Sequence, residues 1–343
     1  MSTIDYKCPG CGGGMVYNSE IGMLYCASCG REEKIEQFAA KYKLEQEHDS
    51  SLQQFHCNSC GAELITDQLS AATVCSFCGS GVIIGERLAG KWSPDLVIPF
   101  TISKEEAIDA FRKWCRNGRF TPKGFMSANR IKAITGMYVP FWLYDLDNDV
   151  EVKARATRIR TYIQGDYQYT ETQHYALYRK LKLNYSQVPI DASEKMNDSL
   201  MDKLEPFPYE QLKSFQVPYL AGFVAEKYSY NEDEMLPRAD EKVKSYIDAY
   251  IQSTLGGFTT VSVTDNDVRR SVKHAKYALL PVWVLHYDYN QLEYTFAMNG
   301  QTGKVVGKPP ISKGKIALWF GVSTTATLLI IKSISAFMGG GFW

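Results

Sequence analysis

The chain repeats one short motif four times near its start: Cys8-Pro-Gly-Cys11-Gly12, Cys26-Ala-Ser-Cys29-Gly30, Cys57-Asn-Ser-Cys60-Gly61 and Cys75-Ser-Phe-Cys78-Gly79. In each pair of motifs 14 residues separate the two CxxC units, and the second pair follows the first at an offset of 49 residues. A CxxC knuckle presents two sulfurs to one ion, and two knuckles complete the tetrahedral shell that zinc prefers. A glycine after each knuckle permits a positive φ, with which the backbone turns back beneath the sulfurs. The sequence therefore predicts two zinc ribbons.

The predicted ligands are eight cysteines, four for each of two structural Zn²⁺ ions: Cys8, Cys11, Cys26, Cys29, Cys57, Cys60, Cys75 and Cys78. A thioredoxin-like redox pair and a disulfide framework are the competing interpretations, and neither predicts four knuckles in two equal repeats. The N-terminus has no basic segment followed by an apolar one, so we expect a reducing compartment, in which close thiols bind metal. The ninth cysteine, Cys115, is expected to be a small buried residue.

Charge indicates which kind of partner the ribbons would bind. Over the whole chain Lys plus Arg and Asp plus Glu both total 38. Residues 1–85 contain five basic and ten acidic side chains, a balance of 5 − 10 = −5, and metal-bound thiolates would add negative charge. A phosphate backbone would repel such a module, because its affinity for proteins depends on cation contacts. We therefore expect a protein partner, with nucleic-acid binding as the alternative.

We predict an α+β fold in five segments: zinc ribbons at residues 1–31 and 56–85, a solvated helical spacer at 32–55, an α+β domain at 92–312, and a transmembrane helix at 316–338. Within the α+β domain, residues 97–176 and 216–310 each contain a Pro-aromatic strand, a helix and a Pro-x-Trp strand. This repetition predicts a weak internal duplication of that domain.

Three features of the α+β domain are similar to binding sites but have a structural interpretation. Trp142 and Trp283 lie in apolar strands, which favours core positions, and a ligand pocket between the two halves is the alternative. The segment from Asn299 to Lys304 lacks the full phosphate-loop pattern and predicts a hairpin turn. Residues 112–132 contain seven basic side chains and no acidic one; we interpret them as a solvated face, the alternative being a surface for anionic lipid or nucleic acid.

No catalytic constellation is evident along the chain. The five histidines have no HExxH or other metal-catalytic spacing, and no nucleophile elbow is present. The predicted cysteine shells are each filled by four ligands, which leaves no open position for a reacting water. We therefore expect a protein that is not an enzyme.

The C-terminal segment has the character of a membrane anchor. Residues 316–331 form a run of 16 without charge, and at about 1.5 Å per residue they fall short of a hydrocarbon core of roughly 30 Å. Continuing through Lys332 to Met338 gives 23 residues, which span if Lys332 extends to the far headgroups. Lys313 and Lys315 precede the run and would keep the N-terminal bulk in the cytoplasm. A buried terminal helix of a soluble domain is the alternative to this single-pass anchor.

Taken together, the two ribbons, the strands Val139-Pro-Phe-Trp-Leu-Tyr-Asp145 and Leu280-Pro-Val-Trp-Val-Leu285, the segment Met298-Asn-Gly-Gln-Thr-Gly-Lys-Val-Val-Gly307 and the apolar C-terminus resemble the YdjG-like family. These are bacterial double-zinc-ribbon membrane proteins of the TFIIB type. The resemblance implies a membrane-anchored adaptor that recruits protein partners to the cytoplasmic face of the cell membrane. It also implies work with a flotillin-like SPFH protein and a phage-shock-protein-A-type protein during envelope stress. No contact residue for these partners carries over.

Overall fold

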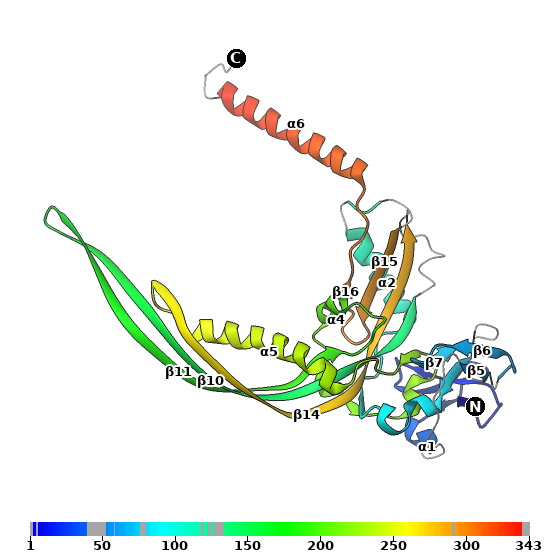
Figure 1. Cartoon of the computed structure of the whole chain (residues 1–343). Helices are drawn as coiled ribbons and strands as arrows, with labels where there is room; N and C mark the ends of the chain where they lie inside the picture. Colours follow the sequence, from blue (N-terminus) through cyan, green and yellow to red (C-terminus); the bar gives the residue numbers. More distant parts are fainter. Residues whose placement is uncertain are drawn as a thin grey trace.

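The fold consists of a mostly β body from which a long β arm and one helix project (Figure 1). The structure is a computed structural model that describes residues 3–4, 6–39, 53–57, 59–75, 80–117, 120–122, 125, 134–289 and 292–337. Its helices are α1 (Ile35–Ala39), α2 (Lys104–Asn117), α4 (Asp198–Leu204), α5 (Glu232–Thr254) and α6 (Lys313–Phe337). Short 3-10 helices are η1 (Gly85–Leu88), η2 (Gly90–Trp92), η3 (Tyr209–Gln211) and η4 (Val217–Leu220).

The strands belong to one large mixed sheet and two small ones. The small sheets are β2 (Met15–Asn18), β3 (Met23–Cys26) and β4 (Glu32–Glu33) in the first ribbon, and β5 (Gln53–His56) with β6 (Glu63–Thr66) in the second. The large sheet contains β1 (Thr3–Ile4), β7 (Ser70–Val74), β8 (Gly81–Ile84), β9 (Leu96–Val97), β10 (Thr135–Gln164), β11 (Tyr167–Asp191), β12 (Lys213–Ser214), β13 (Val224–Glu226), β14 (Thr260–Tyr289), β15 (Leu292–Asn299) and β16 (Val305–Val306).

Backbone hydrogen bonds of the large sheet run from the cysteine-rich segments into the body. Its path is β1-β8-β7-β13-β10-β14-β15-β16, with β11 beside β10 and β9 beside β14. Strand β7 pairs with β13 at Ala72 and Ala225, and β1 pairs with β8. The second cysteine-rich segment is therefore continuous with the body through its strands.

The three long strands β11, β10 and β14 form the arm. Strands β10 and β11 pair without interruption from Leu146 and Tyr185 out to Gln164 and Tyr167, and β14 accompanies β10 as far as Thr157. Helix α5 packs on one face of the arm, where Val243 and the other apolar side chains at its helical spacing are buried. The capping box of Asn231 and Glu234 fixes the start of α5, because each side chain accepts the backbone N–H of the other residue.

The two halves expected to be copies are connected by an exchange of short strands. Each half contains a short strand, a helix and a long strand in the same order: β9, α2 and β10, then β13, α5 and β14. Strand β9 pairs in parallel with β14 of the other half, and β13 pairs in parallel with β10. The long strands are antiparallel, and Val139 lies directly opposite its counterpart Leu280. The two halves therefore have the same order of elements and pair with each other in the same way.

Both tryptophans of the Pro-x-Trp strands lie in the core, as predicted. Trp142 and Trp283 are 7% and 4% exposed, and their indole N–H groups donate to the carbonyls of Tyr230 and Ile102. Phe100 stacks on Phe223 at 4.3 Å, and Trp283 packs against both rings. These aromatic contacts tie the loops before α2 and β13 to the centre of the sheet.

Several local predictions are confirmed. Cys115 is buried, which raises the pKa of its thiol to about 11. The turn after β15 is a tight one, in which the Asn299 side chain accepts the N–H groups of Gln301 and Thr302. In the basic stretch, Arg112 and Lys113 are exposed on α2, while the side chains of its other five basic residues lie outside the described residues.

The spacer predicted at residues 32–55 differs from expectation where the structure describes it. Glu32 and Glu33 form β4, the third strand of the first ribbon, and α1 covers only Ile35–Ala39. Ile35 is 4% exposed and packs in the main core cluster, so this part is docked rather than solvated. Residues 40–52 of the predicted spacer lie outside the described residues.

Candidate metal centres and an adjoining groove

The first cysteine cluster brings together all four predicted ligands of its ribbon. The sulfurs of Cys8, Cys11, Cys26 and Cys29 lie within 4.8 Å of one another. Cys8 Sγ is 3.6 Å from Cys29 Sγ, and Cys11 Sγ is 3.5 Å from Cys26 Sγ. A tetrahedral ion with metal–sulfur bonds of about 2.3 Å requires sulfurs roughly 3.8 Å apart. The cluster therefore matches the size and donor type of a tetrathiolate site.

Glycine and backbone N–H groups produce this geometry. The N–H of Gly12 donates to the carbonyl of Cys8 at 2.9 Å, and Gly30 does the same to Cys26. Gly12 and Gly30 have φ of +74° and +75°, as predicted from the CxxCG pattern. Backbone hydrogen bonds thus close both knuckles of the first ribbon.

The same knuckles favour ionised thiols. The N–H groups of Cys11 and Gly10 lower the pKa of Cys8. Burial opposes ionisation of Cys26, but the N–H groups of Cys29 and Ser28 outweigh it and lower the pKa of Cys26 to about 6. Thiolate is the form that ligates a metal ion, so the backbone prepares two sulfurs for coordination.

The second cluster contains three of its four predicted ligands. Cys57, Cys60 and Cys75 have sulfurs within 4.8 Å of one another, and Cys60 Sγ is 3.8 Å from Cys75 Sγ. The knuckle repeats the geometry of the first ribbon, since Gly61 has φ of +75° and donates to the carbonyl of Cys57 at 2.7 Å. The fourth predicted ligand, Cys78, lies outside the described residues. Both cysteine groups could thus bind metal ions.

The first ribbon is docked against the body through Tyr17 on β2. Its ring is 6% exposed and packs edge-on against Tyr219 at 5.5 Å and near Phe223 at 6.4 Å. Its backbone N–H donates to the carbonyl of Ala221 at 2.9 Å. Burial in this contact raises the pKa of the Tyr17 hydroxyl. The β2–β3 hairpin, whose second strand ends at Cys26 of the first cluster, is therefore in direct contact with the body.

Ionic and hydrogen-bond contacts position the second ribbon. Lys195 Nζ lies 2.6 Å from Asp67 Oδ2 and 3.0 Å from Glu226 Oε1, and the Glu226 residue is 3% exposed. Arg87 donates to Thr66, to the carbonyl of Ser70 at 2.6 Å and to the carbonyl of Asp67. The Lys195 and Asp67 side chains are 38% and 49% exposed, so this salt bridge is a partly solvated contact between the ribbon and the body.

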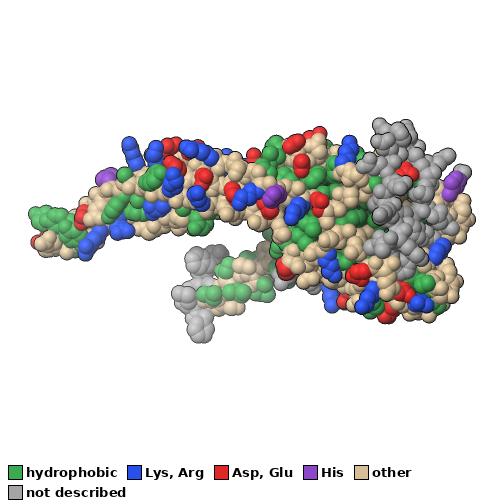
Figure 2. Space-filling view, turned by 90° about the horizontal axis from the view of Figure 1, so that it is seen from below, with side chains coloured by type: hydrophobic (Ala, Val, Ile, Leu, Met, Phe, Trp, Pro, Cys, Tyr) green, Lys and Arg blue, Asp and Glu red, His purple; other side chains and the backbone are tan. Residues whose placement is uncertain are grey.

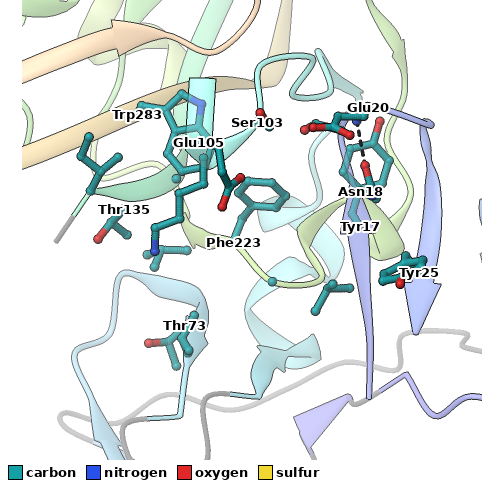
Figure 3. Close-up of a pocket in the computed structure, with 18 residues that line it drawn as sticks. Tyr17, Asn18, Glu20, Tyr25, Thr73, Ser103, Glu105, Thr135, Phe223 and Trp283 are labelled. Carbon is teal, nitrogen blue, oxygen red and sulfur yellow. Dashed lines mark hydrogen bonds between the residues drawn. The ribbon is translucent and has the colours of Figure 1, made fainter. Parts of the chain in front are cut away.

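A groove of about 690 Å³ lies between the first ribbon, β7 and the start of α2 (Figure 3). Its walls are polar and apolar side chains from segments that are distant in sequence: Tyr17, Asn18, Glu20, Tyr25, Thr73, Val74, Ser103, Lys104, Glu105, Thr135, Phe223 and Trp283. The Asn18 side chain accepts the N–H of Glu20 and shapes the turn after β2. No cysteine or histidine is among the residues that line it. The described lining of the groove thus combines polar and apolar side chains.

Sequence reasoning did not find this groove. Its residues come from two ribbons and two halves of the body, and no spacing pattern connects them. One available signal was Ser103 with Glu106, a capping box that marks the first turn of α2 beside the groove. Trp283 lines the groove, whereas Trp142 does not, so this space is different from the pocket between the two tryptophan strands that was the alternative prediction.

Helix α6 presents apolar side chains all round. Lys313–Ile334 is a candidate membrane span of 22 residues with mean hydropathy 1.5, and none of it is buried. Five hydroxyls interrupt the apolar surface, and each donates to a backbone carbonyl of its own helix at 2.8 to 3.0 Å: those of Ser323, Thr324, Thr325, Thr327 and Ser333. In the described part of the chain, α6 is therefore not the buried terminal helix considered as an alternative, and by length and composition it could cross a membrane.

Comparison with known proteins identifies the relatives of this architecture. The chain is 54% identical over 339 residues to the "Uncharacterized protein YdjG" of Bacillus subtilis (strain 168), and the match covers 99% of each chain. The chain belongs to the YdjG family. No protein-family model and no solved structure matches it. The match therefore extends over nearly the full length of this YdjG-family protein and of its relative.

Proposed function

We propose that this YdjG-family protein is a membrane-anchored adaptor that is not an enzyme. Two structural Zn²⁺ ions hold its ribbons, the ribbons and the body form a groove for a segment of a protein partner, and α6 anchors the assembly in the cell membrane. The bulk of the chain faces the cytoplasm, where Lys313 and Lys315 precede the span. Partners of the flotillin-like SPFH and phage-shock-protein-A types, in an envelope stress response, are the candidates.

The observation that carries this proposal is the position of the groove. One wall is the β2–β3 hairpin, and the other wall belongs to the body. Strand β3 of this hairpin ends at Cys26, a proposed ligand in the first cluster. A structural zinc there contributes folding free energy on the order of 10 kcal/mol and gives the hairpin one shape. Since four sulfurs surround the ion, its role is to build the wall, and binding falls to the side chains that line the groove.

The chemistry of the groove favours a protein segment. Tyr25, Val74 and Phe223 offer apolar surface, while Asn18 and Ser103 lie among them with amide and hydroxyl groups (Figure 3). Glu20 and Glu105 outnumber Lys104, the basic side chain among the lining residues. A phosphate backbone would meet carboxylates here, whereas a peptide with apolar and cationic side chains would find partners for both.

Membrane anchoring is tested by carbonate-resistant fractionation of the full chain beside a version that ends at Ser312. We expect the full chain in the membrane fraction and the shorter version in solution. Proteins and nucleic acid that co-purify with each are identified. A soluble full chain would refute the anchor, and co-purified nucleic acid without protein would favour the alternative function.

The groove is tested with a charge reversal and a matched control on the same ribbon. Glu20→Lys lies in the groove, and Glu32→Lys lies on β4, outside the lining residues. Capture of the SPFH-type or phage-shock-protein-A-type candidate by the membrane-bound chain should fall at least tenfold for Glu20→Lys and remain for Glu32→Lys. Equal capture by both variants would show that the partner binds elsewhere.

A further inference from the structure

The end of the arm is built differently from the rest of it. Strand β14 accompanies β10 only to Thr157, where it pairs with Thr260, and α5 ends at Thr254. Beyond that point β10 and β11 continue alone as a two-stranded ribbon, which we call the arm tip and define as residues 158–173 (Figure 1). The arm tip thus extends past every element that covers the arm in the described residues.

The arm tip carries large apolar side chains at its extreme end. Ile163 and Tyr167, on either side of the turn, are 78% and 71% exposed. Tyr162 and Tyr169 stack at 5.5 Å and are each more than two-fifths exposed. Figure 2 shows these hydrophobic side chains gathered at the free end of the arm, whereas charged side chains are spread along its length. A group of exposed aromatic and branched residues at the end of an arm is typical of an interaction site.

Both faces of the arm tip carry exposed apolar side chains among polar ones, which indicates what kind of partner fits. Alternation along β10 places Tyr162 on one face and Ile159 and Ile163 on the other. A protein that docks on one face would leave the other face in water. Insertion into the interfacial layer of a bilayer buries both faces together, and tyrosine is enriched at that depth because its ring is apolar and its hydroxyl polar.

Two arginines and the backbone pairing agree with this partner, while Asp166 in the turn and Glu171 opposite Arg160 balance their charge. Arg160 lies over the Tyr162 ring at 5.9 Å and Arg158 lies over Phe258 at 5.4 Å, so two guanidinium groups sit just behind the apolar end, where lipid phosphates would be. The ladder between the strands continues to Gln164 and Tyr167, and Gly165 closes the turn with φ of +65°. The backbone between the two strands therefore enters the interface already paired.

The arm and α6 extend from the body toward the same side in both overall views (Figures 1 and 2). Contacts at its base give α6 a defined starting direction. Lys315 Nζ donates to the carbonyl of Thr121 at 2.6 Å, the N–H of Ser312 donates to the carbonyl of Phe120 at 2.8 Å, and Trp319 packs edge-on against the Phe120 ring. A membrane crossed by α6 would lie on the side of the body to which the arm reaches.

We propose that the arm tip inserts into the interfacial layer of the same anionic membrane that α6 spans. The chain then touches the bilayer at two separated points. This inference rests on the proposed membrane anchoring. The arm meets the surface end-on, with Ile163 and Tyr167 at the greatest depth and the two arginines at the phosphates.

The test uses the full chain reconstituted in vesicles of phosphatidylglycerol and phosphatidylethanolamine. The photo-cross-linking amino acid p-benzoylphenylalanine replaces Tyr167 in one protein and Tyr178 in a matched control. Both tyrosines lie on β11 and are at least half exposed, and their separation of 178 − 167 = 11 positions corresponds to roughly 36 Å of strand. That separation exceeds the headgroup layer of about 6 Å, so only the first position would contact lipid.

We expect lipid adducts from position 167 at no less than ten times the yield from position 178, measured by mass spectrometry. Adding Ile163→Asp to the protein with the cross-linker at 167 should lower that yield several-fold. Equal yields at both positions, adducts with a second copy of the chain, or no adducts would overturn the proposal. Carbonate extraction of the same samples reports on α6 separately, so failed anchoring and a failed arm tip are distinguishable.

Discussion

The protonation of Asp191, at the base of the arm, predicts how the stability of the body depends on pH. Asp191 is 1% exposed; its Oδ1 accepts the N–H of Ser193 at 3.0 Å, and its Oδ2 has no hydrogen-bond partner. Burial raises the pKa of Asp191 from 3.8 to about 7, although nearby Arg238 opposes the change. Asp198 and Asp202 add negative charge nearby and raise it further.

The direction in which stability changes with pH follows from the number of protons that the folded and unfolded chains bind. Between about pH 4 and pH 7 the folded chain keeps a proton on Asp191 that the unfolded chain has lost, so stability falls as pH rises through this window. With a folded pKa of about 7, the loss between pH 5 and pH 8 is between about 2 and 3 kcal/mol. Asp191→Asn has nearly the same shape and cannot ionise, so this contribution is absent from the variant.

The assay is thermal unfolding of full-length wild type and Asp191→Asn in the same detergent at pH 5, 6, 7 and 8. Other titrating groups are common to both proteins and cancel in the difference. The Tm of the variant minus that of the wild type should increase by about 5 °C from pH 5 to pH 8, at about 2 °C per kcal/mol for a body of this size. A difference that stays constant across this range would refute the assignment of a buried, proton-holding carboxyl.

Three further predictions concern the ribbons and the turn. Cys26→Ser should lower the zinc content from two ions per chain to one, measured by mass spectrometry of the metal, and retention of two would contradict the proposed shell. Tyr17→Ala should destabilise the docking of the first ribbon by about 3 kcal/mol, because it removes a buried ring, and limited proteolysis should then cut the ribbon faster than in Tyr17→Phe. Asn299→Ala should destabilise the body by about 3 kcal/mol in thermal unfolding, since the fully buried amide contacts Leu204, Pro206 and the following turn; no change in Tm would show that the turn forms without it.

The cysteine-rich segments could be predicted from the sequence because their chemistry is local. The geometry of each CxxCG unit is determined by the residues of the unit itself, and Gly12, Gly30 and Gly61 adopt the expected positive φ. The C-terminal helix could be predicted for the same reason, because a long apolar run is recognised from the local sequence alone. Here the described helix begins at Lys313, three residues before the expected start at Ile316.

The arm could not be predicted in this way. Of the 30 residues of β10, the sequence indicated strands only over Val139–Asp145 and Val150–Thr157, and β11, with 25 residues, was missed. The residues from Thr170 to His174 are all polar and show no alternation, because both faces of this part of the arm are exposed. The sequence predicted the helix of the second half over Asp240–Thr254, whereas α5 starts at the capping box of Asn231 and continues through Pro237, a residue that disfavours a helix interior. Strands that are stabilised mainly by pairing with neighbouring strands have little recognisable pattern in their own sequence.

The exchange of short strands between the halves has a consequence for folding during synthesis. Leu96 of β9 pairs with Ala278 of β14, a separation of 278 − 96 = 182 residues, and Ala72 of β7 pairs with Ala225 of β13. Contacts this distant in sequence make closure of the sheet slow. The four cysteines of the first ribbon lie within 22 residues of one another, 8 to 29, but the first half has open strand edges until β14 has been made. A chaperone that shields those edges would therefore act on the nascent chain in the interval between the two halves.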